Sequence, residues 1–407
     1  MFNSICTFPL PSDLLAQAIH PTSPLLALGL ASGHVQIIRL PALPPDSSPE
    51  SRAEASSTNG HGRVETVWRT RRHKAGCRSL AFTLDGSRLF SAGADGIVKV
   101  ATTETGEVTG KIAIPSDRDL DGISDSPNLL HVLSPQTLLL ATDNSAVHIY
   151  DLRTDSTIQG ARPQQTHHPH DDYVSSLTAL SPSETSTSGF SRQWFSTGGS
   201  TVAVTDVRKG IVFQSESLGE ELLSGTAIGN KFIAGGEKGA VRMWEGGIKG
   251  LMGGINKKTA IQRGESLDVM CQMWEESPGE DVIAVGLGDG SVKIVQLGAK
   301  RINVLDSVKH DEVEGVVTLG LEPGGRMISG GGSIVKIWEK ETADDLDEEA
   351  DGADSDRDDG RNGTESADSQ SDSTEEEERR PKRKKRKRNK GKTKGGTNHI
   401  MAFKGMD

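Results

Sequence analysis

Side chains with metal-binding chemistry gather in one short segment near the middle of the chain, HHPHDD at residues 167–172. Imidazoles and carboxylates are ligand types that hold divalent metals. The candidate ligands are His167, His168, His170, Asp171 and Asp172. The alternative is structural, because the segment links two repeated units and His170 has a structural role available there. We favour the structural role and expect no metal site.

A second candidate for chemistry is Gly391-Lys392-Thr393, which has the residue types that end a phosphate-binding loop. The glycine required five positions before Gly391 is Arg386, and the segment lies in a basic run instead of a strand-to-helix turn. The chain holds no G-x-S-x-G, H-E-x-x-H or C-x-x-C motif. We therefore expect a protein that is not an enzyme and needs no cofactor.

The cysteines and the apolar runs indicate the compartment. Cys6, Cys77 and Cys271 form an odd set without metal-like or redox-like spacing, which is typical of a reduced intracellular protein. The N-terminal residues lack the basic start and apolar core of a secretory signal. No apolar run approaches the roughly 18 residues that span a bilayer. We expect an intracellular protein without a membrane partner.

The densest charge in the chain is RRPKRKKRKRNKGKTK at residues 379–394, where twelve of sixteen residues are Lys or Arg and none is acidic. A solubilising linker needs far fewer charges. Runs of this kind act as nuclear or nucleolar addresses and as RNA-binding patches. The predicted targeting residues are Arg379, Arg380, Lys382, Arg383, Lys384, Lys385, Arg386, Lys387, Arg388, Lys390, Lys392 and Lys394.

An acidic segment precedes this basic block, since residues 341–378 hold 18 acids and two bases. Ser373 and Thr374 stand directly before four glutamates, a context that acidophilic kinases favour. A phosphate at either would add roughly −1.5 to −2 charges. With almost no apolar residues, segments 341–378 and 379–407 are predicted to form a disordered, acidic-then-basic tail. Residues 1–340 hold 38 acids and 31 bases, so strong attraction to RNA must come from the tail.

The rest of the chain is a repeat whose copies are visible at its glycine-rich turns. Seven stretches have an apolar strand, a turn of small residues and a strand that begins Val-x-apolar, as in LFSAGADGIVKVAT and IAVGLGDGSVKIVQL. The valines are Val35, Val98, Val147, Val202, Val241, Val292 and Val335, spaced 39 to 63 residues apart. Several copies carry a further apolar strand before this hairpin, and the variable link after it holds a fourth.

Seven four-stranded units predict an all-β, seven-bladed propeller over residues 1–340. An open row of units would expose two sheet edges. We therefore expect a closed ring, with FNSICTF at residues 2–8 supplying the outer strand of the last unit. The Pro/Ser-rich segment 41–63 is predicted to be a disordered loop, and the Gly-rich, basic residues 246–265 an insertion loop.

The repeat resembles the WD40 family. Four residue pairs fall where that family has its Trp-Asp pair: Trp338-Glu339, Trp244-Glu245, Tyr150-Asp151 and Thr205-Asp206. The resemblance gives structural roles to His73, Ser91, Asp95, Tyr150, Asp151, His170, Asp206, Trp244, Asp289, His310 and Trp338. Asp95 and Asp289 are expected to bond backbone in turns. Two units depart from the pattern, with Ala101 and Val295 in the place of Trp, and no unit has the full His, Ser, Asp and Trp set.

One stretch of the repeat matches a docking motif. IYDLR, residues 149–153, is similar to the aromatic-Asp-x-Arg box of WD40 substrate receptors that dock on the DDB1 adaptor of Cullin-4 ubiquitin ligases. In that resemblance Tyr150 fills the Trp position, while Asp151 and Arg153 close a strand end. WD repeats produce this pattern readily, so adaptor docking stays the second hypothesis.

A narrower resemblance is to the family of WD repeat-containing protein 55 and its fungal nucleolar relatives. It rests on the N-terminal FNSICTFPLPSDLL, on HKAGCRSLAF at 73–82 and on the final IVKIWEK. It implies a nuclear, nucleolar scaffold protein that serves rRNA production and ribosome biogenesis. The implied partners are ribosome-assembly proteins and, through the basic tail, pre-rRNA. The resemblance transfers no catalytic residue, and we expect the protein to be monomeric on its own.

Overall fold

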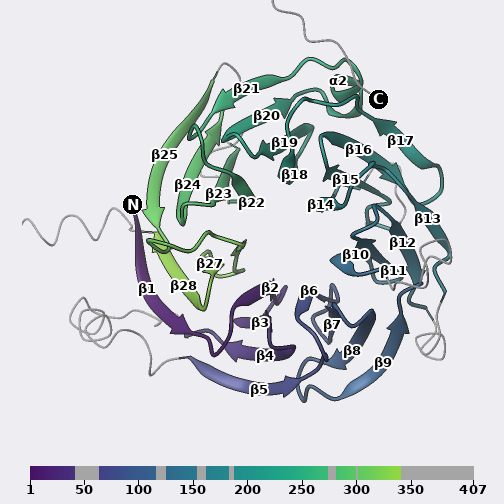
Figure 1. The fold of residues 1–407 in the computed structure, drawn as a ribbon, viewed down its shortest axis with the longest axis vertical. Helices are drawn as coiled ribbons and strands as arrows, with labels where there is room; N and C mark the ends of the chain where they lie inside the picture. The colour runs from purple at the N-terminus through teal and green to yellow at the C-terminus, as the bar shows by residue number, and fades with distance from the viewer. Residues whose placement is uncertain are drawn as a thin grey trace, which may run out of the picture. The chain divides into compact units, whose positions relative to one another are not determined.

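The computed structural model divides the chain into two compact units, Met1–Glu349 and Ala350–Asp407. It describes residues 1–41, 64–115, 125–153, 162–182, 188–273, 281–298 and 301–340. The described part of the first unit is a ring of seven four-stranded antiparallel sheets, called blades below (Figure 1). This confirms the predicted all-β, seven-bladed propeller. The predicted segments 341–378 and 379–407, and residues 42–63 of the predicted loop, lie outside the described residues.

The blades follow one another in chain order, each with its first strand nearest the centre of the ring (Figure 1). Blade 1 contains β2 (Leu14–Ile19), β3 (Leu25–Leu30), β4 (His34–Arg39) and β5 (Glu65–Arg71). Blade 2 contains β6 (Cys77–Phe82), β7 (Arg88–Gly93), β8 (Ile97–Thr102) and β9 (Val108–Ala113). Blade 3 contains β10 (Pro127–Ser134), β11 (Thr137–Thr142), β12 (Val147–Asp151) and β13 (Gln165–His167). Blade 4 contains β14 (Val174–Ala179), β15 (Gln193–Gly198), β16 (Thr201–Asp206) and β17 (Gly210–Gln214). Blade 5 contains β18 (Leu222–Ile228), β19 (Lys231–Gly236), β20 (Ala240–Trp244) and β21 (Lys257–Ala260). Blade 6 contains β22 (Leu267–Gln272), β23 (Val282–Leu287), β24 (Ser291–Leu297) and β25 (Ile302–Lys309). Blade 7 contains β26 (Thr318–Leu321), β27 (Met327–Gly331), β28 (Ile334–Lys340) and β1 (Phe2–Pro9).

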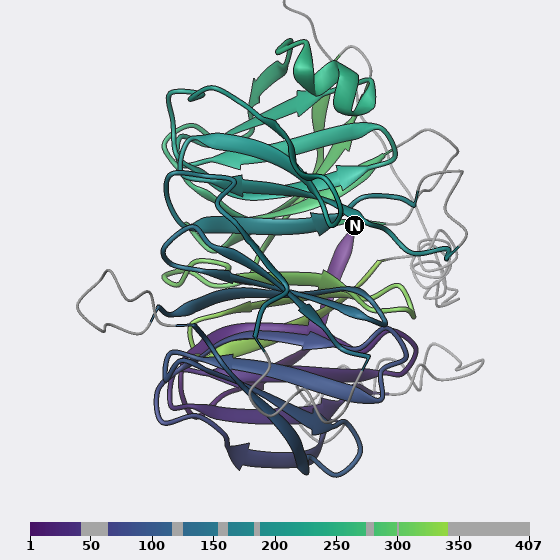
Figure 2. The ribbon, with the colours of Figure 1, turned by 90° about the vertical axis from the view of Figure 1, so that its right-hand side faces the viewer.

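The middle strands are mostly buried, because most blades have a neighbouring blade packed against each face (Figure 2). The valine that marked the repeat lies in the third strand of every blade. All seven copies, Val35, Val98, Val147, Val202, Val241, Val292 and Val335, are 0% exposed. The described residues form seven apolar clusters, and each cluster joins two adjacent blades. The core of the ring therefore lies between the blades.

The tight turn between the second and third strands of a blade binds the backbone that enters the next blade. Gly33 has φ 77°, and a Cβ there would lie 2.3 Å from the His73 carbonyl oxygen. The Gly33 carbonyl accepts the His73 backbone N–H at 3.0 Å. Gly290, at φ 79°, accepts the His310 backbone N–H at 2.8 Å in the same way. Glycine is required at both turns because a side chain would strike the incoming backbone.

The N-terminal strand closes the ring. β1 pairs antiparallel with β28, from Phe2 opposite Lys340 to Pro9 opposite Ile334, with one bulge between Ser4 and Cys6. The innermost strands of blades 1 and 7, β2 and β26, are also in contact. The sequence-based prediction that residues 2–8 complete the last blade is thus confirmed.

The insertion at residues 246–265 has more structure than the sequence indicated. It contains a short helix, α2 (Gly247–Met252), and the outer strand of blade 5, β21. Leu251 anchors the helix, because its side chain is buried in the cluster of Trp244 and Phe232. The strand was missed because its sequence, KKTA, has no apolar alternation. Among the described residues, no helix is long and apolar enough to cross a membrane.

Deleting residues 1–9 should destabilise the ring, because β28 would become an unpaired edge and the buried side chains of Phe2 and Cys6 would be lost. We expect a large loss of soluble monomer, measured by size-exclusion chromatography, and a lower melting temperature of what remains. Ser4→Ala, at an exposed position of the same strand, is the control and should change neither. Full solubility with an unchanged melting temperature after the deletion would show that β1 is dispensable for closure.

Candidate functional site

His73, Ser91 and Asp95 form a hydrogen-bonded triad in blade 2. His73 Nδ1 lies 2.9 Å from Asp95 Oδ1, and His73 Nε2 lies 3.0 Å from Ser91 Oγ. The connectivity matches that of a catalytic Ser-His-Asp triad, but Ser91 is only 1% exposed, so no substrate can reach its hydroxyl. Asp95 Oδ2 also accepts the Lys74 backbone N–H at 3.0 Å. The triad therefore ties the start of blade 2 to its own tight turn.

Blade 4 holds a second histidine in the same manner. His170 Nδ1 lies 2.7 Å from Thr201 Oγ1, and Nε2 lies 2.9 Å from Ser196 Oγ. Burial lowers the pKa of His170 to about 4, so the imidazole is neutral at physiological pH. The sequence identified the histidine but neither hydroxyl partner.

The other members of HHPHDD do not converge with His170. His168 Nδ1 lies 3.2 Å from Ser145 Oγ, and His167 Nε2 lies 3.1 Å from Gln165 Oε1. Across the part of the chain that the structure describes, no three His, Cys, Asp or Glu side chains are placed to hold a metal ion. The segment is arranged as a link between blades 3 and 4.

Blade 7 carries the third histidine network. His310 Nδ1 lies 2.8 Å from Ser329 Oγ, and Trp338 Nε1 donates to the same oxygen at 2.7 Å. Burial lowers the pKa of His310 to about 4. The serine thus joins the start of the blade to its third strand.

The remaining WD-type positions serve turns and the core. Asp289 Oδ1 accepts the Ser291 backbone N–H at 2.9 Å, and its Oδ2 accepts Gln262 Nε2 at 2.6 Å. Asp206 Oδ1 accepts the backbone N–H of Arg208 at 2.8 Å. Trp244 is buried at the junction of blades 4 and 5.

One equivalent network escaped the sequence analysis because it uses different residue types. In blade 5, Glu220 is buried, and its Oε1 accepts Arg242 Nη2 at 2.7 Å and Lys258 Nζ at 2.6 Å. A Cβ added at Gly236 would meet Glu220, as one added at Gly93 would meet His73. Glu220 therefore occupies the histidine position, and nothing in the WD pattern signals an acid there.

The Tyr150–Arg153 segment combines a buried and an exposed part. Tyr150 is buried in the cluster between blades 2 and 3, and its hydroxyl has no hydrogen-bond partner in the described part of the chain. Arg153 is exposed, with 62% of its side chain accessible, and its Nε donates to Asp151 at 2.8 and 2.9 Å. These hydrogen bonds lower the pKa of Asp151 to about 2. The segment thus presents a guanidinium that is already paired with a carboxylate.

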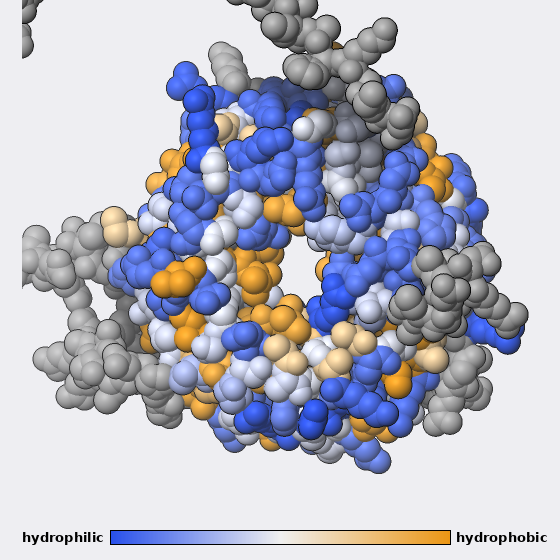
Figure 3. Space-filling model, viewed as in Figure 1, coloured by the Kyte–Doolittle hydropathy of each residue, from blue (hydrophilic) through white to orange (hydrophobic). Residues whose placement is uncertain are grey.

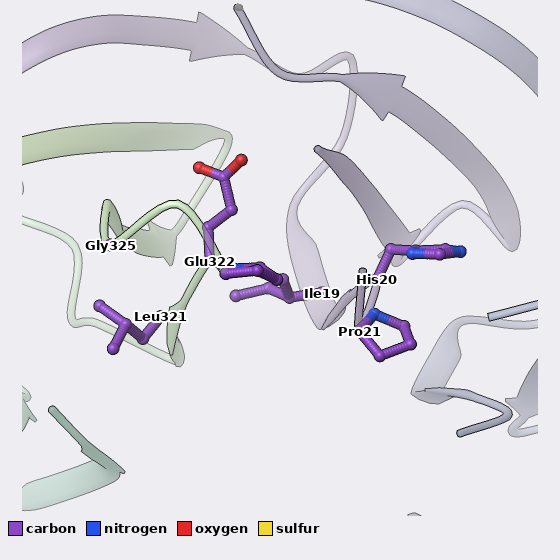
Figure 4. A pocket seen from close by; sticks show the side chains of 7 residues that line it. Ile19, His20, Pro21, Leu321, Glu322 and Gly325 are labelled. Atoms are coloured by element: carbon purple, nitrogen blue, oxygen red, sulfur yellow. The ribbon is translucent and has the colours of Figure 1, made fainter. Parts of the chain in front are cut away.

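A shallow hollow of 480 Å³ lies where blades 1 and 7 meet, with Ile19 and Pro21 on one side and Leu321 on the other (Figure 4). Glu322 turns its carboxylate away from Leu321 and accepts Arg326 Nε at 2.6 Å. The side chains that remain available at this hollow are apolar.

A second hollow, of 350 Å³, lies between blades 3 and 4. Its walls come from the β10–β11 turn, the end of β12, the residues before β15 and those after β16. Elsewhere, one face of the ring is mostly hydrophilic, with apolar side chains along part of the central opening (Figure 3). Both of these hollows, built from described residues, lie at blade junctions.

The described cysteines offer no nucleophile near neutral pH. Burial raises the pKa of the Cys77 and Cys271 thiols to about 12, and it also raises the pKa of Cys6. The twelve predicted targeting residues of 379–394 lie outside the described residues, and so do the predicted phosphorylation sites Ser373 and Thr374.

Comparisons with known proteins agree with this geometry. Residues 64–100 match the WD domain, G-beta repeat family. The chain is 51% identical over 352 residues to a WD repeat-containing protein jip5 of Aspergillus terreus, covering 83% of this chain and 82% of that protein. It is 51% identical over 371 residues to WD repeat-containing protein JIP5 of Coccidioides immitis, covering 87% and 86%. A JIP5 of Phaeosphaeria nodorum is 50% identical over 366 residues, covering 86% and 84%. No catalytic family is indicated.

The buried histidines predict how stability depends on pH. Because the folded-state pKa of His170 is lowered to about 4, the unfolded state binds the proton more tightly below about pH 6.5. We expect the free energy of unfolding, from urea titrations, to fall as pH drops from about 6.5 towards 4, with no contribution from this group above that range. His170→Asn should lower stability at pH 7.5 by about 1–3 kcal/mol and flatten the slope.

Ser4→Ala, at an exposed position and without any titratable group removed, is the control for this experiment and should leave the slope unchanged. A His170→Asn variant with the wild-type pH dependence would show that the imidazole is not held neutral by the fold.

Proposed function

This chain belongs to the family of WD repeat-containing JIP5 proteins, and from that premise we propose that it acts as a nucleolar scaffold in ribosome biogenesis. WD propellers are protein-interaction modules, so the ring is the part that binds protein partners. The observation that carries the proposal is the combination, in one chain, of such a ring with twelve bases in residues 379–394. The resemblance to the WD repeat-containing protein 55 family points in the same direction.

Electrostatics assigns RNA attraction to the basic block. Residues 1–340 hold 38 acids and 31 bases, so the ring repels a polyanion at long range. For single-stranded RNA, each phosphate that the block neutralises contributes about −0.7 to the slope of the logarithm of the binding constant against the logarithm of the salt concentration. We propose that the block brings the protein to pre-rRNA while the ring binds assembly proteins.

The acids before the block limit its attraction for RNA. Residues 341–378 hold 18 acids and two bases directly beside the twelve bases. At physiological salt the Debye length is about 8 Å, so only adjacent charges compete for the same Lys and Arg. Phosphorylation at Ser373 or Thr374 would add negative charge at the boundary and weaken RNA binding further.

Deleting residues 379–394 should disperse a fluorescently tagged protein from the nucleolus, as imaged in living cells. Deleting 343–378 is the matched control. It should leave the protein nucleolar and strengthen binding to single-stranded RNA at low salt, because the competing carboxylates are gone. Intact nucleolar concentration without the basic block would place the address in the ring and refute this assignment.

A second function has its own observation in its favour. In the IYDLR segment Arg153 is exposed and Tyr150 is buried, and the match of this segment to the DDB1-docking box supports a receptor role in a Cullin-4 ubiquitin ligase as the alternative proposal. Co-purification separates the two proposals. Ribosome-assembly factors would support the scaffold, and DDB1 with Cullin-4 would support the receptor.

Arg153→Ala should abolish co-precipitation of DDB1 if the receptor proposal holds. Among the described residues, the Arg153 side chain forms hydrogen bonds only with Asp151. Asp151 would keep its hydrogen bond from Gln164 in the variant, so we expect little change in the melting temperature. Arg69→Ala, an exposed arginine on β5, is the control and should retain DDB1. Wild-type protein that never captures DDB1 would eliminate the receptor role.

A further inference from the structure

The hollow between blades 3 and 4 has an excess of positive charge. Three arginines line it, Arg153, Arg192 and Arg208, against one acid, Asp151. Asp151 is occupied by Arg153 and by Gln164 Nε2, which donates to it at 2.9 Å. One of the three guanidiniums is therefore neutralised within the hollow, and two remain.

Neither Arg192 nor Arg208 has a carboxylate partner for its guanidinium within the described ranges. In the paired strands β15 and β16, the acid nearest to the two arginines in sequence register is Asp206. Its Oδ1 accepts the Arg208 backbone N–H at 2.8 Å. Its Oδ2 accepts Gln193 Nε2 at 3.0 Å. Asp206 is thus used by the turn itself.

The pairing of β15 with β16 brings the two arginines to the same end of one hairpin. Gln193 opposite Asp206 is the last pair in the ladder of β15 and β16. One step beyond it, the Val207 backbone N–H donates to the Arg192 carbonyl at 2.9 Å. Arg192 therefore directly precedes β15 and Arg208 lies in the turn after β16, so the hairpin brings both to one hollow, which reduces the entropic cost of using both on one ligand.

The other lining groups supply walls and few competing acceptors. Ser191 Oγ donates to the Gln193 carbonyl at 2.8 Å, and Ser134 Oγ donates to Thr137 Oγ1 at 3.0 Å. Pro135 and Val207 are apolar lining residues. The hollow thus combines two available guanidiniums with hydroxyls that already have partners and with apolar walls.

We propose that this hollow binds a phosphorylated side chain, phosphoserine or phosphothreonine, in an acidic segment of a partner protein. Guanidinium forks match phosphate oxygens bidentately, and clusters of arginine are the usual receptors of phosphorylated motifs. A volume of 350 Å³ accommodates one such side chain with its neighbouring atoms. RNA is disfavoured, because a polynucleotide needs a continuous basic track and the ring carries more acids than bases.

This site is independent of the nucleolar role, but it shares its hollow with Arg153, the residue proposed to dock DDB1. It uses Arg192 and Arg208 of blade 4, and it leaves Arg153 bound to Asp151. Loss of nucleolar targeting would therefore not affect it, whereas bound DDB1 would compete with a phosphopeptide for the hollow.

The test is fluorescence anisotropy of the full chain with a short labelled peptide that carries one phosphoserine between acidic residues. The expected result is binding tighter than that of the same peptide with serine, by roughly tenfold or more. The double variant Arg192→Gln/Arg208→Gln should abolish this preference with an unchanged melting temperature. Arg69→Gln is the control that removes one exposed arginine elsewhere on the ring.

Two further arms locate the site. A photo-crosslinking version of the phosphopeptide should label residues 188–208 in wild-type protein, whereas labelling confined to 379–394 would overturn the proposal. Equal affinity for the serine and phosphoserine peptides would also overturn it. A third result would also overturn it: the double variant loses oligouridylate binding, and the wild-type protein shows no preference for the phosphopeptide. The hollow would then be an RNA contact.

Discussion

Every blade in this ring depends on the strand pairing that joins the two ends of the propeller. A single four-stranded blade buries little by itself, since each apolar cluster is built from two neighbouring blades. A linear row would leave the first and last blades with one bare apolar face and one bare sheet edge. The pairing of β1 with β28 removes both defects together, because it fixes blade 7 against blade 1 and completes the cluster around Leu14 and Val335.

The link from one blade to the next is mainly a backbone device, which explains why its side chains vary. The turn carbonyls of Gly33 and Gly290 accept the backbone N–H groups that begin the following blade. Those bonds do not depend on side-chain type. Blades 2, 4 and 7 add a buried histidine, whereas blade 5 uses Glu220 with Arg242. Each of these groups has at least one hydrogen-bond partner, which offsets part of the cost of burying it, but His310 Nε2 and Glu220 Oε2 have none among the described residues.

Sequence alone predicted those features that repeat or that closure demands. The seven valines were found because burial on both faces imposes the same apolar pattern on every third strand, and residues 2–8 because an open edge is unfavourable. The pairing of His170 with Ser196 and Thr201 was out of reach, since it spans 26 and 31 residues with no fixed spacing. Glu220 was missed because an ion pair replaced the expected imidazole. β21 was missed because an outer strand needs no apolar alternation.

The same logic explains why the most distinctive chemistry lies at the strand ends. Substitutions in the middle strands change a cluster shared by two blades, so most of those positions hold apolar side chains or polar side chains with buried partners, such as Ser91 and Ser196. Residues one step past a ladder, such as Arg192 beyond Gln193, have fixed backbones but free side chains. Two neighbouring blades can therefore place arginines around one hollow without any cost to the core. The hollow was invisible in the sequence, since Arg153 and Arg208 come from different repeats and meet only once the blades pack.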